Sequence, residues 1–104
     1  MQTKEEIELR KSVLLATYDA LIGYISANVR MITIDWSEKH YHIKVYFYQP
    51  TNDKDLEDFQ AVSAEVLAHF PKMVSCKEEV EYSEKSIEDL KGLKEMVFLR
   101  KGEI

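Results

Sequence analysis

The sequence predicts an α+β fold, a two-layer α/β sandwich in which a four-stranded sheet carries both helices on one face. Two observations predict it. Apolar residues repeat at the helical period near the N-terminus and again after residue 53, and shorter segments rich in β-branched and aromatic residues lie between and after them. The resulting order is helix, strand, strand, helix, strand, strand. Because each helix has one apolar stripe, each needs one sheet face, and a single sheet can serve both.

Two helices follow from the apolar spacing. The first covers residues 3–26, with Thr3 and Glu6 forming a capping box. The second covers residues 53–70, capped by Thr51 or Asn52 and ended by Pro71. We expect one inner stripe on each helix. The stripes are Ile7, Leu14, Tyr18, Leu21, Ile22 and Ile25 in the first helix, and Leu56, Phe59, Val62, Ser63, Val66, Leu67 and Phe70 in the second.

Four strands fill the rest of the chain. Residues 29–36 and 40–49 are separated by a short polar break, which is typical of a hairpin. Residues 74–82 form a polar strand suited to a sheet edge, and residues 96–101 close the domain. Residues 83–95 are a polar connection. An antiparallel and a mixed sheet both remain open; a parallel pairing of the second and third strands requires a right-handed crossover.

The second strand has two different faces. Alternation places Tyr41, Ile43, Val45 and Phe47 toward the core. The other face holds His40, His42, Lys44, Tyr46 and Tyr48. Exposed tyrosines suit protein interfaces, because a large rigid ring loses little entropy on binding. The alternative is a cross-strand aromatic pair on a sheet face that meets solvent.

Length and composition limit the class of protein. The 104 residues, 1–104, are expected to form a single domain. The lone cysteine, Cys76, excludes an internal disulfide and fits a reducing compartment. No apolar run approaches the roughly 20 residues that span a membrane, and the charged N-terminus lacks the apolar block of a signal peptide. We therefore expect a soluble, cytoplasmic protein with no membrane partner.

The negative charge is concentrated in one part of the chain. The net charge is −5, but residues 51–90 hold eleven acids and four bases, a net of −7. Four acids lie within six residues at the start of the second helix, more than the helix dipole requires: Asp53, Asp55, Glu57 and Asp58. Such a balance argues against direct nucleic-acid binding and is compatible with a basic protein partner. The alternative is a solvated face that maintains solubility.

No catalytic or metal motif stands out. His40 and His42 point to one side of a strand, but a third metal ligand cannot be identified, and neither Cys-x-x-Cys nor His-Glu-x-x-His occurs. Nearby glutamates would raise the pKa of Cys76, so we expect a buried or half-buried inert thiol. The three glycines form no phosphate-binding loop. The sequence therefore predicts neither an enzyme nor a cofactor or metal site.

Several segments together resemble a known class of proteins. They are residues 28–36 (NVRMITIDW), 42–48 (HIKVYFY), the acidic helix ending in 64–71 (AEVLAHFP), 78–82 (EEVEY) and 97–101 (VFLRK). From about residue 14 to residue 101 the chain resembles small immunity proteins of bacterial polymorphic toxin systems. In particular, it is similar to those paired with contact-dependent growth inhibition toxins. Residues 83–95 match the pattern least.

The resemblance implies a non-enzymatic inhibitor. Such a protein binds the C-terminal toxin domain of a large surface protein inside the producing cell and blocks its active site. Those toxins are often nucleases, which need a basic active site to attract a polyanion. An acidic inhibitor then matches its charge. The residues expected to bind the toxin are Asp53, Asp55, Glu57, Asp58, Glu78, Glu79, Glu81 and Glu84, with Trp36, Tyr46 or Tyr48 as an apolar anchor.

A second hypothesis is a structural or interaction domain without enzymatic activity. The strand face that bears the tyrosines would then form a homodimer. The two hypotheses differ in the expected mass in solution, although an inhibitor can also dimerise. The sequence does not identify the toxin, its chemistry or the interface residues.

Overall fold

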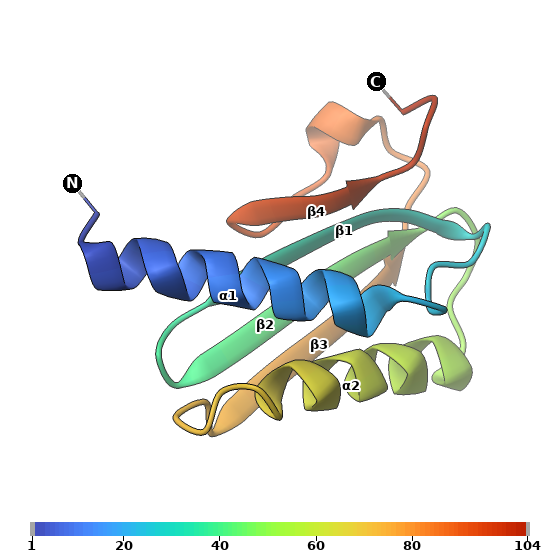
Figure 1. Cartoon of the computed structure of the whole chain (residues 1–104). Helices are drawn as coiled ribbons and strands as arrows, with labels where there is room; N and C mark the ends of the chain where they lie inside the picture. The colour runs from blue at the N-terminus through green and yellow to red at the C-terminus, as the bar shows by residue number, and fades with distance from the viewer. Residues whose placement is uncertain (1, 104) are drawn as a thin grey trace.

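The computed structural model describes residues 2–103. The predicted order of two helices and four strands is confirmed (Figure 1). Both helices are shorter than expected at their C-terminal ends, and a short 3-10 helix, η1, lies in the polar connection. The elements are α1 (Lys4–Leu21), β1 (Val29–Trp36), β2 (His40–Phe47), α2 (Asp53–Leu67), β3 (Ser75–Tyr82), η1 (Ile87–Asp89) and β4 (Glu95–Leu99).

The sheet is mixed, with strand order β3-β2-β1-β4. β1 pairs antiparallel with β2 and with β4, whereas β2 and β3 are parallel and are joined by α2. This settles the choice between an antiparallel and a mixed sheet. The polar strand β3 lies at an edge, as its sequence predicts. Because α2 returns the chain along β2, its first turn lies at the end of the sheet where β2 and β3 finish (Figure 1).

Both helices contact the same face of β2. The hydroxyl groups of Thr17 in α1 and Tyr41 in β2 are 2.9 Å apart in a buried hydrogen bond. In α2, the ring of Phe59 packs edge-on against Phe47, with 6.1 Å between ring centroids. Tyr41 and Phe47 lie six residues apart and so point to the same side of the strand. Burial also raises the pKa of Tyr41 to about 12.

The inner face of α1 differs from the prediction. Its buried residues are Val13, Ala16, Thr17, Ala20 and Leu21. The expected inner stripe is wrong for four members, which are exposed: Ile7, Tyr18, Ile22 and Ile25. The helix has two apolar stripes, and the sheet accepts the one made mostly of small side chains, which allow close packing. The inner stripe predicted for α2 is confirmed at Phe59, Val62, Ser63 and Val66.

The opposite face of the sheet is partly covered by the polar connection. The hydroxyl of Tyr46 donates to the carbonyl of Lys91 at 2.9 Å, and the Leu93 amide donates to Thr33 Oγ1 at 2.9 Å. Gly92 lies so close to the sheet that an added Cβ would be 3.0 Å from Thr33 Cγ2. Tyr46 is consequently 2% exposed, so the expectation that it faces solvent is wrong.

Candidate functional site

Acidic side chains from two elements gather at one end of the sheet. α2 begins there and β3 finishes there (Figure 1). We call this region the strand-end surface. It comprises the acids Asp53, Asp55, Glu57, Asp58 and Glu84 together with Tyr48. These residues are six of the eleven that the sequence predicts for toxin binding.

The four acids of α2 have different local roles. Asp55 and Asn52 form a capping box, with both side chain–backbone hydrogen bonds at 3.0 Å. Asp58 Oδ1 is 3.0 Å from Lys54 Nζ one turn away. Asp53 and Glu57 are exposed and form no salt bridge with the residues that the structure describes. The negative charge most open to a partner therefore comes from Asp53 and Glu57.

β3 divides its acids between the two faces of the sheet. Glu79 points away from the helices and lies 2.8 Å from His42 Nε2, and this hydrogen bond lowers the pKa of the Glu79 carboxyl. Glu78 points toward the helix side, where its Oε2 is buried without a hydrogen-bond partner among residues 2–103. Glu81 pairs with Tyr46 and lies on the same face of the sheet as Glu79, beside Lys44. None of these three glutamates belongs to the strand-end surface, because strand alternation and local contacts direct them elsewhere.

The end of β3 is fixed next to the end of β2. The Ser83 amide donates to the Phe47 carbonyl at 3.2 Å, and the Ser83 carbonyl accepts from Arg30 Nη1 at 3.0 Å. Tyr82 is exposed, and a hydrogen bond with Glu84 raises the pKa of its phenol. Glu84 thus extends from an anchored backbone rather than from a free loop.

A buried ion pair supports this end of the molecule. Arg30 Nε lies 2.7 Å from Glu103 Oε2, and the two side chains are 6% and 12% exposed. The hydrogen bond from Arg30 lowers the pKa of the Glu103 carboxyl. The guanidinium also lies 5.7 Å from the ring centre of Tyr48. This pair was not predicted from the sequence, although an arginine inside an apolar strand indicates that an acidic partner is needed.

Trp36 lies at the opposite end of the sheet from Tyr48. It pairs with Tyr41 next to the β1–β2 turn, and Lys94 Nζ lies 4.7 Å from its ring centre. Tyr48 instead follows the last residue of β2 and is 38% exposed. Trp36 and Tyr48, two of the three proposed aromatic anchors, therefore cannot belong to one compact patch.

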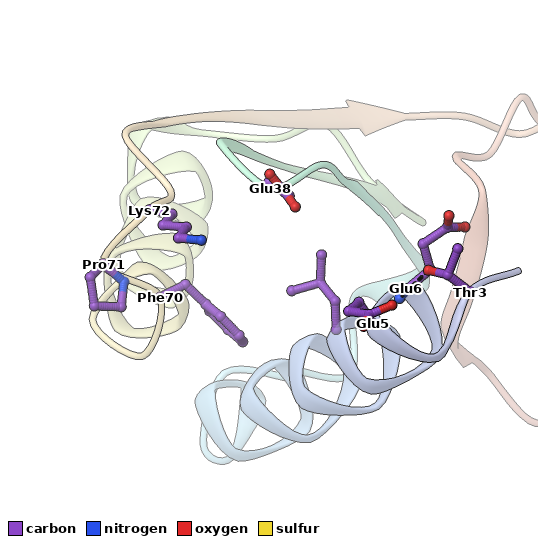
Figure 2. Close-up of a pocket in the computed structure, with 8 residues that line it drawn as sticks. Thr3, Glu5, Glu6, Glu38, Phe70, Pro71 and Lys72 are labelled. Carbon is purple, nitrogen blue, oxygen red and sulfur yellow. Dashed lines mark hydrogen bonds between the residues drawn. The ribbon is translucent and has the colours of Figure 1, made fainter.

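A cleft that no sequence pattern predicted lies at this opposite end of the sheet. Figure 2 shows it between the first turns of α1 and the connection from α2 to β3. It has a volume of about 520 Å³, and Leu9 and Phe70 supply apolar surface. Figure 2 also shows Glu38 and Lys72 around the same space. The lining residues are Thr3, Glu5, Glu6, Leu9, Glu38, Phe70, Pro71 and Lys72.

The remaining reactive side chains have local partners. His40 Nδ1 lies 2.8 Å from Ser75 Oγ, and His42 contacts Glu79. Cys76 is exposed, so the expectation of a buried thiol is wrong; it lies on the outer edge strand. Partial burial of the thiol and a hydrogen bond with Glu78 nevertheless raise the pKa of Cys76 to about 11.

Within residues 2–103, no group of three or more His, Cys, Asp or Glu side chains is placed to hold a metal ion. Over the same residues, neither helix combines the length and apolar character needed to cross a membrane.

The acidic strand-end surface on a small α+β domain is typical of a protein-binding domain. Comparison with known families gives the particular assignment. Residues 10–102 match the family model described as MafI2 immunity protein, and the chain belongs to this family. The resemblance to polymorphic-toxin immunity proteins is therefore confirmed. A search of curated proteins finds no match.

Proposed function

We propose that this chain binds its cognate toxin domain in the cytoplasm of the producing cell and blocks the active site with the strand-end surface. Membership of the MafI2 immunity protein family supports neutralisation of a toxin. The observation that supports the mode of binding is the grouping of acids from α2 and from the end of β3 at one end of the sheet. We further propose that the toxin is a basic nuclease.

Electrostatics connects the surface to this kind of target. A nuclease must attract a polyanion, so basic residues surround its active site. An acidic surface is attracted to the same residues, and complementary charge increases the rate of association. A protein that covers those residues excludes the substrate without any chemical step. In this proposal the chain acts without catalysis and without a cofactor, and contact-dependent delivery of the toxin remains part of the hypothesis.

The structure narrows the set of residues proposed to contact the toxin. Asp53, Glu57 and Glu84 are exposed at the strand-end surface. Tyr48 is the proposed anchor, because it is exposed there and Arg30 holds its ring from one side. Five of the residues predicted from the sequence are left out because they are buried, lie at the opposite end of the sheet, or point to its outer face: Tyr46, Trp36, Glu78, Glu79 and Glu81.

One pair of variants tests the role of the strand-end surface. Glu57 and Glu65 are both exposed residues of α2, near its start and near its end. Glu57→Lys should reduce the association rate with the purified toxin domain by about tenfold at low salt, whereas Glu65→Lys, with the same net charge, should change it little. Stopped-flow fluorescence measures both rates. Equal effects of the two variants would exclude a local role for the strand-end surface.

The burial of Tyr46 argues against a homodimer through the tyrosine-bearing face of β2. Tyr46 is 2% exposed beneath residues 83–95, and its hydroxyl bonds to Lys91. This face would have to shed its cover before it could bind a second copy.

A further inference from the structure

Within residues 2–103, β3 pairs with β2 alone and leaves the other side of its backbone without a partner strand (Figure 1). The Ser75 amide donates to the Lys39 carbonyl at 3.2 Å. The Ser83 amide donates to the Phe47 carbonyl, also at 3.2 Å. The odd-numbered residues of β3 therefore bond to β2, and the even-numbered residues direct their amides and carbonyls toward the open edge. Those residues are Cys76, Glu78, Val80 and Tyr82.

We propose that a strand of the cognate toxin domain pairs with the open edge of β3 and so adds a strand to the sheet. The inference rests on the proposed function and deepens it, because it adds a backbone contact to the acidic strand-end surface. An edge strand presents a row of free N–H and C=O groups, which is a template for a strand from another chain. None of the eight residues of β3 is buried, so a partner can reach the whole strand.

The open edge of β3 leads directly to the strand-end surface. β3 ends at Tyr82, which is 37% exposed, and Glu84 of the strand-end surface follows two residues later. Between them, hydrogen bonds of the Ser83 amide and carbonyl hold the backbone in place. A toxin domain that binds the strand-end surface therefore has the end of β3 beside it, and one partner can contact both.

The side chains of β3 indicate which kind of strand fits this edge. β3 carries three acids and one base, Lys77, a net charge of −2. Glu79 and Glu81 lie on the outer face of the sheet, whereas Val80 lies on the helix side next to Val45. Opposite charges on neighbouring strands stabilise their pairing, and like charges oppose it. The fitting strand therefore alternates, with Lys or Arg beside the two glutamates and an apolar residue beside Val80.

The charge of β3 favours a basic strand over a second copy of this chain. Charged side chains protect an edge strand from unselective pairing. For β3 this protection is selective, because its acids repel an acidic strand and attract a basic one. A second copy would bring its own β3, with a net charge of −2, against this edge, and each whole chain carries −5. The basic toxin of the proposed function meets no such repulsion.

A proline at residue 78 tests the pairing. The Glu78 amide points to the open edge, so Glu78→Pro removes one free donor and leaves the hydrogen bonds to β2 in place. Edge strands accept proline at such positions. Glu78→Ala is the matched control, because it removes the same carboxylate and keeps the amide. In calorimetry with the purified toxin domain, Glu78→Pro should bind about tenfold more weakly than Glu78→Ala, while circular dichroism verifies that both variants are folded.

Amide hydrogen exchange of the unsubstituted chain, followed by NMR, tests the same contact without a change in sequence. Binding of the toxin domain should slow exchange about tenfold or more at the four amides of the open edge. The odd-numbered amides of β3 are the internal reference, since β2 protects them before the toxin binds.

Three results would overturn the inference. Toxin binding with unchanged exchange at the four amides, or with equal affinities of Glu78→Pro and Glu78→Ala, would exclude strand pairing and leave the neutralising function intact. Protection of these amides that grows with the concentration of the chain alone would assign the open edge to a second copy. A toxin domain that does not bind the chain at all would refute the proposed function together with the inference.

Discussion

Removal of the Glu103 carboxylate should destabilise the fold strongly, although Glu103 is next to the last residue of the chain. The Arg30–Glu103 pair joins the C-terminal segment to β1 at 2.7 Å and is almost completely shielded from water. Breaking a buried ion pair on one side typically costs 3–5 kcal/mol, because the remaining charge stays buried. In Glu103→Gln, Arg30 retains a hydrogen bond to the Ser83 carbonyl. We therefore expect this variant to lose about 3 kcal/mol of its free energy of unfolding, near the lower limit of that range.

Urea unfolding at neutral pH measures this loss. Glu103→Gln should lower the unfolding midpoint with an unchanged slope, and the control Glu65→Gln should stay within about 0.5 kcal/mol of wild type. Replacing both partners, as in Arg30→Met/Glu103→Gln, should cost less than Glu103→Gln alone, because no buried charge is left unpaired. A loss below about 1 kcal/mol in Glu103→Gln, or a double variant less stable than it, would refute this reasoning.

The same pair predicts a pH dependence. Arg30 lowers the pKa of the Glu103 carboxyl below its ordinary value of 4.5. The folded state therefore binds this proton less readily than the unfolded chain does. The ion pair contributes fully to the free energy of unfolding above pH 4.5, the ordinary pKa of a glutamate in the unfolded chain. This contribution is lost as the pH falls through the lowered pKa that the Glu103 carboxyl has in the folded state. The difference in stability between wild type and Glu103→Gln should shrink over that acidic range.

Three further outcomes are expected. Gly92→Val should lower stability by about 1–3 kcal/mol in urea unfolding, because its Cβ would already lie 3.0 Å from Thr33 Cγ2; an unchanged midpoint would contradict the close packing. The Cys76 thiol should react slowly with a disulfide reagent at pH 8 and accelerate toward pH 11, as its raised pKa requires; a fast reaction at pH 8 would disagree. Tyr48→Ala should weaken toxin binding at least tenfold in calorimetry, whereas Trp36→Ala should leave the affinity unchanged. A loss of affinity in Trp36→Ala but not in Tyr48→Ala would show that the toxin binds at the opposite end of the sheet.

The sequence predicts the elements well because each has a strong local signal. The alternation of Tyr41, Ile43, Val45 and Phe47 identifies the buried face of β2, and all four side chains are buried. The polar composition of β3 predicts an edge strand, which it is. Parallel pairing of β2 with β3 could not be chosen, because local patterns do not show which strands become neighbours.

Side-chain exposure was harder to predict where a segment can turn either of two faces inward. α1 has apolar residues on two sides, and the burial of small residues such as Ala16 and Ala20 decided which side packs on the sheet. Tyr46 is buried by residues 83–95, whose polar side chains give no sign that their backbone lies over the sheet. Tertiary packing decided both cases.

The candidate site was predictable in charge but not in shape. The excess of acids in residues 51–90 is visible in the sequence. Which acids lie together depends on strand alternation and on local pairing, as the different surroundings of Glu78, Glu79 and Glu81 show. The support from Arg30 and Glu103 joins residues 73 positions apart and required the fold.

Growth of bacteria that express the cognate toxin domain together with this chain tests the central claim most directly. Wild type and Glu65→Lys should both restore growth. The double variant Glu57→Lys/Glu84→Lys, folded and equally abundant, should fail to protect, because both changes reverse charge at the strand-end surface. Full protection by the double variant would contradict binding through this surface. Toxicity that wild type does not relieve would contradict the neutralising function itself.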